Sequence, residues 1–156
     1  MTATINDTLR KQIERGVVFY GYASNTDLAD AAAVEILIRI GSVTTELIFA
    51  MGAETTSIIS LTEDVTVSAT GSSLPLNNMN RDSAETTGAT TFLGPTTSGG
   101  ANKYLQYAYD GRISNISPIN SENGILLKAS TDYKLSITNS SGFAGSYTFN
   151  WFLREI

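Results

Sequence analysis

The sequence contains no histidine and no cysteine. Histidine is the most common general base and a frequent ligand of transition metals, so its absence excludes a Ser-His-Asp triad and most zinc, iron and copper sites. The absence of cysteine excludes disulfide bonds, thiolate metal sites and a cysteine nucleophile. Glycine-rich nucleotide-binding fingerprints and the H-E-x-x-H helix of metalloproteases are also missing. The sequence therefore contains few of the residues and motifs that usually support catalysis or metal binding.

Charged residues are scarce, since they make up 16% of the 156 residues, against roughly 25% in an average globular domain. The formal net charge is −5, and the only tight basic group is formed by Arg10, Lys11 and Arg15. Nucleic-acid binding needs basic residues gathered on one face, where they neutralise phosphates. We therefore interpret this group as the solvated face of a helix and expect no nucleic-acid partner.

Long apolar runs are missing, because none approaches the ~20 residues that a membrane-spanning helix requires. The N-terminus also lacks a charged segment followed by an apolar one, which is the pattern of a secretory signal. We expect no membrane partner, and we expect the chain to be made in a cytoplasm or assembled there into something larger.

What the chain has in abundance is Thr, Ser, Asn and Gly. Thr suits the half-buried pleated surface of a strand, and the other three suit turns, so this mixture favours an all-β domain. The strongest strand pattern covers residues 34–40, where Val34, Ile36, Ile38 and Ile40 share one face. Four β-branched residues on one face with period two would be poor material for a helix.

Short strands recur along the rest of the chain at a spacing of about 8–12 residues, which is typical of a sandwich or barrel. Gly41 and Ser42 predict a hairpin between strands 34–40 and 44–50, and residues 24–30 predict a turn-rich link with a single helical turn. We expect about eight strands in one domain over residues 17–156: an all-β, two-sheet antiparallel β-sandwich that is jelly-roll-like. The expected strands cover residues 17–23, 34–40, 44–50, 56–61, 65–69, 86–93, 124–128, 131–138 and 145–153.

Residues 1–16 predict a short N-terminal helix or an arm. Asn6 or Asp7 is the expected N-cap and Gly16 the expected stop signal. The apolar stripe of this helix is thin, with Leu9 and Ile13 at i, i+4 spacing. Because a lone helix of this length is not stable in water, it should pack on its own domain or lie on a neighbour.

The carboxylates and lysines form no recognisable catalytic pattern. Glycosidases need two carboxylates at a fixed separation, and nothing in the sequence brings Glu63, Asp64 or Asp82 into such a pair. Hard oxygen ligands for calcium are available in two loops, although neither follows the EF-hand pattern. We expect no catalytic residue, no metal and no cofactor, and leave a calcium loop open at Asn25, Asp27 and Asp30, or at Asn78, Asn80 and Asp82.

Two loop segments are candidates for contact with a partner. Arg81, beside Asn80, suits either a bidentate pair with a carboxylate or a loop-stabilising bond to backbone carbonyls. Tyr104, Tyr107 and Tyr109 suit a sugar-stacking or interface patch, with at least one ring expected in the core.

The order of several motifs resembles a family of tailed-bacteriophage virion proteins. The motifs are the strand pair 34–40 and 46–50, the strand 65–69, a Gly-Ser-Ser turn, a Leu-Pro-Leu step, the Asn80-Arg81-Asp82 loop and a closing block over residues 125–152. The similarity covers roughly residues 33–153 and is to small head-decoration, or cement, proteins encoded near major capsid genes. The chain departs from that pattern where it has Thr62-Glu-Asp in place of a more usual Tyr-Glu-Gly turn, and residues 1–30 match nothing in it.

This resemblance implies a protein without catalytic activity that sits on the exterior of a capsid after assembly in the cytoplasm of a bacterial host. It implies a contact with the major capsid protein and a homo-oligomer, often a trimer. The alternative is a carbohydrate- or receptor-binding module of a tail fibre or baseplate. A hydrolase using loop carboxylates is a third class. The expected interface residues are Leu9, Ile13, Asn80, Arg81, Tyr104, Tyr107 and Tyr109.

Overall fold

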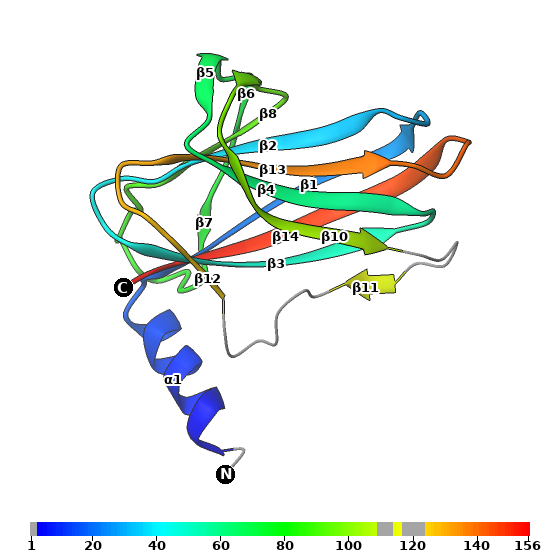
Figure 1. Cartoon of the computed structure of the whole chain (residues 1–156). Coiled ribbons are helices and arrows are strands. Elements are labelled where there is room, and N and C mark those ends of the chain that lie inside the picture. Colours follow the sequence, from blue (N-terminus) through cyan, green and yellow to red (C-terminus); the bar gives the residue numbers. More distant parts are fainter. Residues whose placement is uncertain (1–2, 109–113, 117–123) are drawn as a thin grey trace.

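The structure is a computed structural model that describes residues 3–108, 114–116 and 124–156, with side chains described for residues 9–105 and 124–156. Within these ranges it has one helix and a series of antiparallel strands (Figure 1). They are α1 (Ala3–Glu14), β1 (Val18–Leu28), β2 (Ala33–Arg39), β3 (Thr45–Ala53), β4 (Ser57–Glu63), β5 (Thr66–Ala69), β6 (Ser72–Leu74), β7 (Asn77–Asn78), β8 (Thr90–Leu93), β9 (Thr96–Ser98), β10 (Ala101–Ala108), β11 (Ser114–Ile116), β12 (Ile125–Leu127), β13 (Asp132–Asn139) and β14 (Gly145–Glu155).

The strands form two main sheets that pack face to face. Sheet A has the order β11-β3-β14-β1-β7, with β12 also paired to β3, and sheet B has the order β10-β4-β13-β2-β8-β6. The first four strands alternate between the two sheets, as do the last three. This is the topology of a jelly roll, so the predicted all-β, two-sheet sandwich is confirmed. Strands β5 and β9 form a separate two-stranded ribbon within the long connection from β4 to β10.

Two local predictions are wrong. The expected hairpin at Gly41 and Ser42 does not exist, because β2 belongs to sheet B and the strand that follows belongs to sheet A. The expected link with a helical turn at residues 24–30 is mostly strand, since β1 continues to Leu28 along β14. In both places the pairing partner is a distant strand, which local turn residues do not reveal.

The core lies between the two sheets and follows the predicted alternation. Side chains at alternate positions of β2, β13 and β14 point inward and are almost fully buried. Trp151 is the largest of them and has no exposed surface. It stands opposite Gly21 in the β1–β14 register, where a Cβ atom would lie only 2.4 Å from the indole ring. A glycine is therefore required at this position by the close approach of the ring.

The N-terminal helix extends away from the sandwich and meets it only near its C-terminal end (Figure 1). It begins at Ala3, so the predicted N-cap at Asn6 or Asp7 is wrong, because both residues lie inside the helix. Its predicted end is confirmed. Gly16 has a φ of 76° and donates to the carbonyl of Ile13, while Val17 donates to that of Gln12, which is a Schellman motif.

Candidate functional site

The end of α1 is held by side-chain amides from the Asn-rich loop 77–82. The Asn80 Nδ2 donates to the carbonyl of Glu14 at 2.9 Å, and the Asn78 Nδ2 donates to the carbonyl of Gly16 at 2.8 Å. The last carbonyls of a helix have no partner inside the helix, so these amides satisfy groups that would otherwise need water. The loop therefore fixes the direction in which the helix leaves the sandwich.

The loop is itself rigid, because its Asn side chains also close local turns. The Asn78 Oδ1 accepts from the backbone N–H of Asn80 at 2.9 Å, and the Asn80 Oδ1 accepts from that of Asp82 at 3.1 Å. Each is an Asx-turn, in which a side chain satisfies its own backbone two residues ahead. The same two residues thus shape the loop with their oxygens and hold the helix with their nitrogens.

An apolar groove lies between α1 and the outer face of sheet A. Its volume is about 260 Å³, and almost all of its lining atoms are apolar. Leu9 and Ile13 line the helix side, so these two predicted interface residues face one space. The opposite side is lined by Val18, Ile48, Met79, Phe152 and Arg154. The thin helical stripe therefore packs partly on its own domain and leaves room for an apolar group from elsewhere.

A buried ion pair between two strands of sheet A lies beside this groove and also contacts the helix. Arg154 on β14 pairs through Nη2 with Oε2 of Glu46 on β3, and Glu46 is only 5% exposed. The Glu46 Oε1 accepts from the backbone N–H of Gly124 at 2.7 Å, and the Arg154 Nη1 donates to Oε1 of Gln12 at 2.8 Å. One charge pair thus ties together α1, β3, β14 and the chain entering β12.

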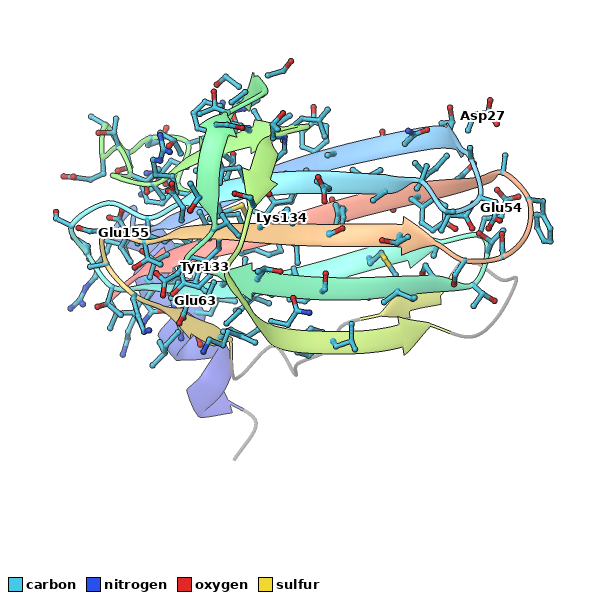
Figure 2. All side chains as sticks on the ribbon, turned by 45° about the horizontal axis from the view of Figure 1, so that its top comes forward. Asp27, Glu54, Glu63, Tyr133, Lys134 and Glu155 are labelled. Carbon is cyan, nitrogen blue, oxygen red and sulfur yellow. The ribbon has the colours of Figure 1, made fainter. Side chains whose placement is uncertain are left out.

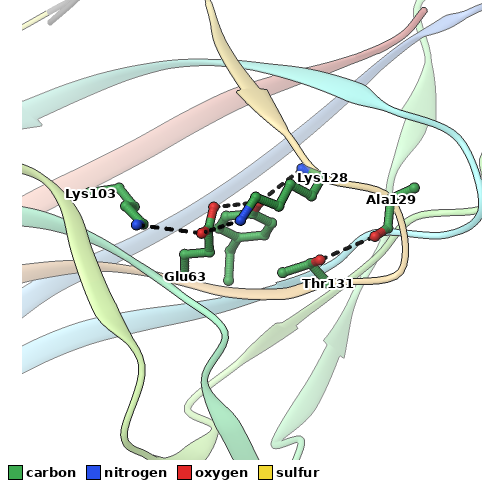
Figure 3. A network of polar contacts seen from close by, with 6 residues as sticks. Glu63, Lys103, Lys128, Ala129 and Thr131 are labelled. Atoms are coloured by element: carbon green, nitrogen blue, oxygen red, sulfur yellow. Dashed lines mark hydrogen bonds and ion pairs between the residues drawn. The ribbon is translucent and has the colours of Figure 1, made fainter.

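A second polar cluster closes the corner formed by β4, β10 and β13 (Figure 3). The Glu63 Oε1 accepts from Lys128 Nζ at 2.8 Å and lies 3.6 Å from Lys103 Nζ, while its Oε2 accepts from the Tyr133 hydroxyl at 3.0 Å. The hydrogen bond from Lys128 is the main reason that the pKa of Glu63 lies below its ordinary value, despite the opposing effect of burial. The carboxylate thus joins β4, β10 and the segment around the start of β13, which indicates a structural role.

This cluster makes acid stability depend on Glu63. A carboxylate whose pKa is lowered by folding contributes stability above its unfolded pKa, and that contribution disappears as the pH falls through the folded value. We expect Glu63→Gln to lower the melting temperature at pH 7 and to approach the wild type well below the ordinary pKa of 4.5. Thermal melting between pH 7 and pH 3 measures the difference, and Glu85→Gln, at an exposed position, is the control. An equal deficit at pH 7 and pH 3 would contradict this role.

The other predicted interface residues lie apart from the groove. Arg81 is exposed and makes no hydrogen bond or ion pair with the described residues. Tyr104 on β10 is half-buried, with its ring edge against Phe49 at 5.7 Å between centroids, and burial raises its pKa. This packing confirms the expectation that at least one of these rings lies in the core. The backbone of Tyr107 pairs with Ile58, its side chain is not among those described, and Tyr109 lies outside the described residues.

In both predicted calcium loops, Asn side-chain oxygens accept hydrogen bonds from the local backbone. No group of three or more acidic side chains in this part of the chain is placed to hold a metal ion. The Asn25 Oδ1 accepts from the backbone N–H of Asp27 at 2.9 Å, which is again an Asx-turn.

Among the described helices, none has the length and apolar character needed to cross a membrane.

Sequence reasoning missed the ion pair and the amides of Asn78. Glu46 and Arg154 are far apart in the sequence, and no motif surrounds either of them. It also missed the aromatic side chains on the outer face of sheet A. In β1 both faces carry apolar residues, with Phe19 buried, Tyr20 half-buried and Tyr22 59% exposed, so alternation alone could not tell the core face from the outer one.

Comparisons with known proteins identify no family. No protein-family model matches the sequence, and no curated protein matches it. Among solved structures, one similar chain is Merkel cell polyomavirus VP1 in complex with GD1a oligosaccharide, with 11% identity over 88% of this chain and 77% of that chain. Its TM-score is 0.17, which is too low to support a conclusion about fold or function.

Proposed function

We propose that this protein is a non-enzymatic structural protein of a tailed-bacteriophage virion, a decoration protein that binds the lattice of the major capsid protein. The resemblance in sequence supports this proposal, and so does the lack of catalytic side chains. The observation that carries it is the position of α1, which leaves the jelly roll as an arm and is bonded to the sandwich through Gln12 and Glu14 in its last turns. A projecting helix on a rigid sandwich is suited to reach a neighbouring subunit.

The mechanism in this proposal is mechanical. A decoration protein bridges adjacent capsid subunits and adds buried contact area, which opposes the pressure of the packaged DNA. The arm would lie on the capsid, and the sandwich would remain on the exterior, after assembly in the cytoplasm of the bacterial host. The sandwich is well built for such a load, because its long central strands pair along most of their length in both sheets.

The alternative, a glycan- or receptor-binding module built on the Tyr104–Tyr109 segment, is not favoured by an observation of this kind. Tyr104 packs against Phe49 and does not stand on the surface as a stacking platform. We therefore propose the single function of head decoration, with the major capsid protein and further copies of this chain, often three in the family that it resembles, as partners.

Deletion of residues 1–15 tests the role of the arm. The first strand begins at Val18, so the truncated chain keeps every strand of both sheets and should remain folded. We expect it to lose binding to undecorated capsids, measured by co-sedimentation, because the capsid contact has been removed. Circular dichroism and size-exclusion chromatography verify that the truncated sandwich is folded and soluble. Full decoration by the truncated chain would show that α1 is not the capsid contact.

A further inference from the structure

Met79 stands at the centre of the attachment between α1 and the sandwich. Asn78 and Asn80, on either side of it, hold the end of the helix through their side-chain amides. The backbone N–H of Met79 donates to the carbonyl of Val18 at 2.9 Å, which ties the residue to the first strand. The main chain of Met79 therefore cannot follow a displaced side chain without disturbing one of these bonds.

This attachment lies at one end of the sandwich. Figure 2 shows the helix at the end that carries Glu63 and Glu155, whereas Asp27 and Glu54 lie at the opposite end. The backbone N–H of Glu155 donates to the carbonyl of Val17, directly after the helix. A local change at Met79 thus acts on the arm and leaves the far end of the two sheets untouched.

The side chain of Met79 lines the apolar groove and is also open to solvent. It shares with Leu9 and Ile13 the space of about 260 Å³ between the helix and sheet A. A thioether suits such a place, because it is apolar, flexible and polarizable. Met79 is nevertheless 38% exposed, so a small solute can reach it from the water.

Met79 is the most readily oxidised of the exposed side chains that the structure describes. The chain has no Cys and three Met, of which Met51 is fully buried and Met1 lies outside the described residues. In the reaction with hydrogen peroxide, the sulfur lone pair attacks one peroxide oxygen and the O–O bond breaks. The sulfur gains an S–O bond and loses two electrons, and the proton of the transferred oxygen goes to the departing hydroxide, which leaves as water.

The lining of the groove offers a sulfoxide oxygen almost no hydrogen-bond donor. Arg154 is the one polar residue among those that line it, and two of its nitrogens are bonded to Glu46 and Gln12. Its Nε has no partner among the described residues, but it is buried. The oxygen is therefore best solvated when the oxidised side chain turns out of the groove into water. The apolar stripe of the helix then loses a neighbour.

We propose that Met79 is a site of reversible oxidation by peroxides, and that its sulfoxide loosens the attachment of α1 to the sandwich. Methionine sulfoxide reductases return the sulfoxide to the thioether, so the change is a switch and not only damage. The site makes the position of the arm depend on redox conditions in a domain without a thiol. It requires no partner molecule and can be studied in the free protein.

Peptide mapping by mass spectrometry tests the site of oxidation. The full-length chain is treated with increasing amounts of hydrogen peroxide and then digested completely. We expect Met79 to gain one oxygen at least about tenfold faster than Met51, because susceptibility to oxidation follows exposure. Equal rates at Met79 and Met51 would overturn the proposed site.

Limited digestion of the folded chain with trypsin tests the effect on the helix. Arg10, Lys11 and Arg15 lie in or directly after α1 and are exposed. The next basic residue in the sequence is Arg39, so early cleavage reports on the helix alone. We expect oxidation to raise the rate of this cleavage about three- to tenfold, as the cost of a poorly solvated polar group in the groove becomes a larger population of the open helix.

Met79→Leu is the matched control. Leucine keeps the apolar volume but has no sulfur, and the variant retains the other two methionines. Its cleavage rate should be the same before and after peroxide treatment. Met79→Gln, which puts a polar group in the groove without any oxidant, should be cleaved faster than the wild type. Treatment of the oxidised wild type with methionine sulfoxide reductases should return cleavage to its starting rate.

Three results would overturn the proposed switch. They are an unchanged cleavage rate in the oxidised wild type, an equal acceleration in Met79→Leu, and a failure of reduction to reverse the effect. Circular dichroism verifies that the sandwich stays folded after oxidation. The wild type is compared with itself, so the result holds even where a variant does not fold. No capsid is involved, and the proposed head decoration is judged separately by co-sedimentation.

Discussion

Replacing Arg154 with methionine should lower the free energy of unfolding by roughly 3–5 kcal/mol, which is the usual cost of removing one partner of a buried ion pair. The loss arises because Glu46, only 5% exposed, would keep a buried negative charge with a single hydrogen bond from the Gly124 N–H. Methionine preserves much of the length and apolar volume of the arginine stem, so the change isolates the charge. Urea unfolding followed by circular dichroism measures the effect.

Two variants control this result. Arg39→Met removes an ion pair in which the Arg39 and Asp132 side chains are 44% and 23% exposed, so it should cost no more than about 1 kcal/mol. The double variant Glu46→Gln with Arg154→Met removes both charges and should regain most of the lost stability. If Arg154→Met were no more destabilising than Arg39→Met, the Glu46–Arg154 ion pair would not be important for stability.

The strands of this protein were predictable because their alternation is local. In β2, β13 and β14 a run of alternating large apolar residues already shows which face lies in the core, as at Tyr133, Leu135 and Ile137. The sheet to which each strand belongs was not predictable in this way. The hairpin predicted at Gly41 does not form, because the chain does turn there but connects a strand of sheet B to a strand of sheet A.

Irregular strands were difficult to predict from the sequence for a different reason. The segment around Tyr104 fits neither a helical nor a strand period in the sequence, and just before it β10 contains an irregularity between Asn102 and Tyr104. A bulge adds one residue to one strand and so shifts the alternation of its side chains. Residues 24–27 are polar and resemble a turn, yet Ser24 and Asn25 pair with β14, and the register shifts only between Asn25 and Leu28.

The candidate site was only partly predictable. Leu9, Ile13 and Asn80 were expected at an interface, and the structure brings them together around α1, the first two through the groove and the third through the Glu14 carbonyl. Arg154 contributes to the same groove but has no sequence motif. Its importance comes from its pairing with Glu46 across two neighbouring strands, which only the sheet register reveals.

These features have a common physical basis in the asymmetry of the sandwich. Sheet B carries partly exposed ion pairs on its outer face, whereas sheet A carries the helix, the apolar groove and the buried Glu46–Arg154 pair. A domain can be specific for a partner if one of its faces is chemically distinct from the rest of its surface. The proposed arm lies on the side of this face, where Leu9 and Ile13 line the groove.

Truncating Trp151 to alanine should lower the free energy of unfolding by roughly 3–5 kcal/mol, as is usual for a large aromatic residue in a core. Trp151 has no exposed surface and lies over Gly21, where a Cβ atom would come within 2.4 to 2.6 Å of three atoms of the indole ring. Gly21→Ala should therefore destabilise the wild type by about 1–3 kcal/mol, because the rigid ring must shift to admit the methyl group. Urea unfolding of each variant measures both effects.

The double variant decides whether the clash is the cause. With Trp151→Ala in place, the space over the strand is empty, so adding Gly21→Ala should cost far less than it does in the wild type. Gly52→Ala is a matched control on β3, since its Cβ atom would meet only the hydroxyl of Thr148, which can rotate away. Additive losses from Gly21→Ala and Trp151→Ala would mean that the two residues do not interact, and that the glycine is required for another reason.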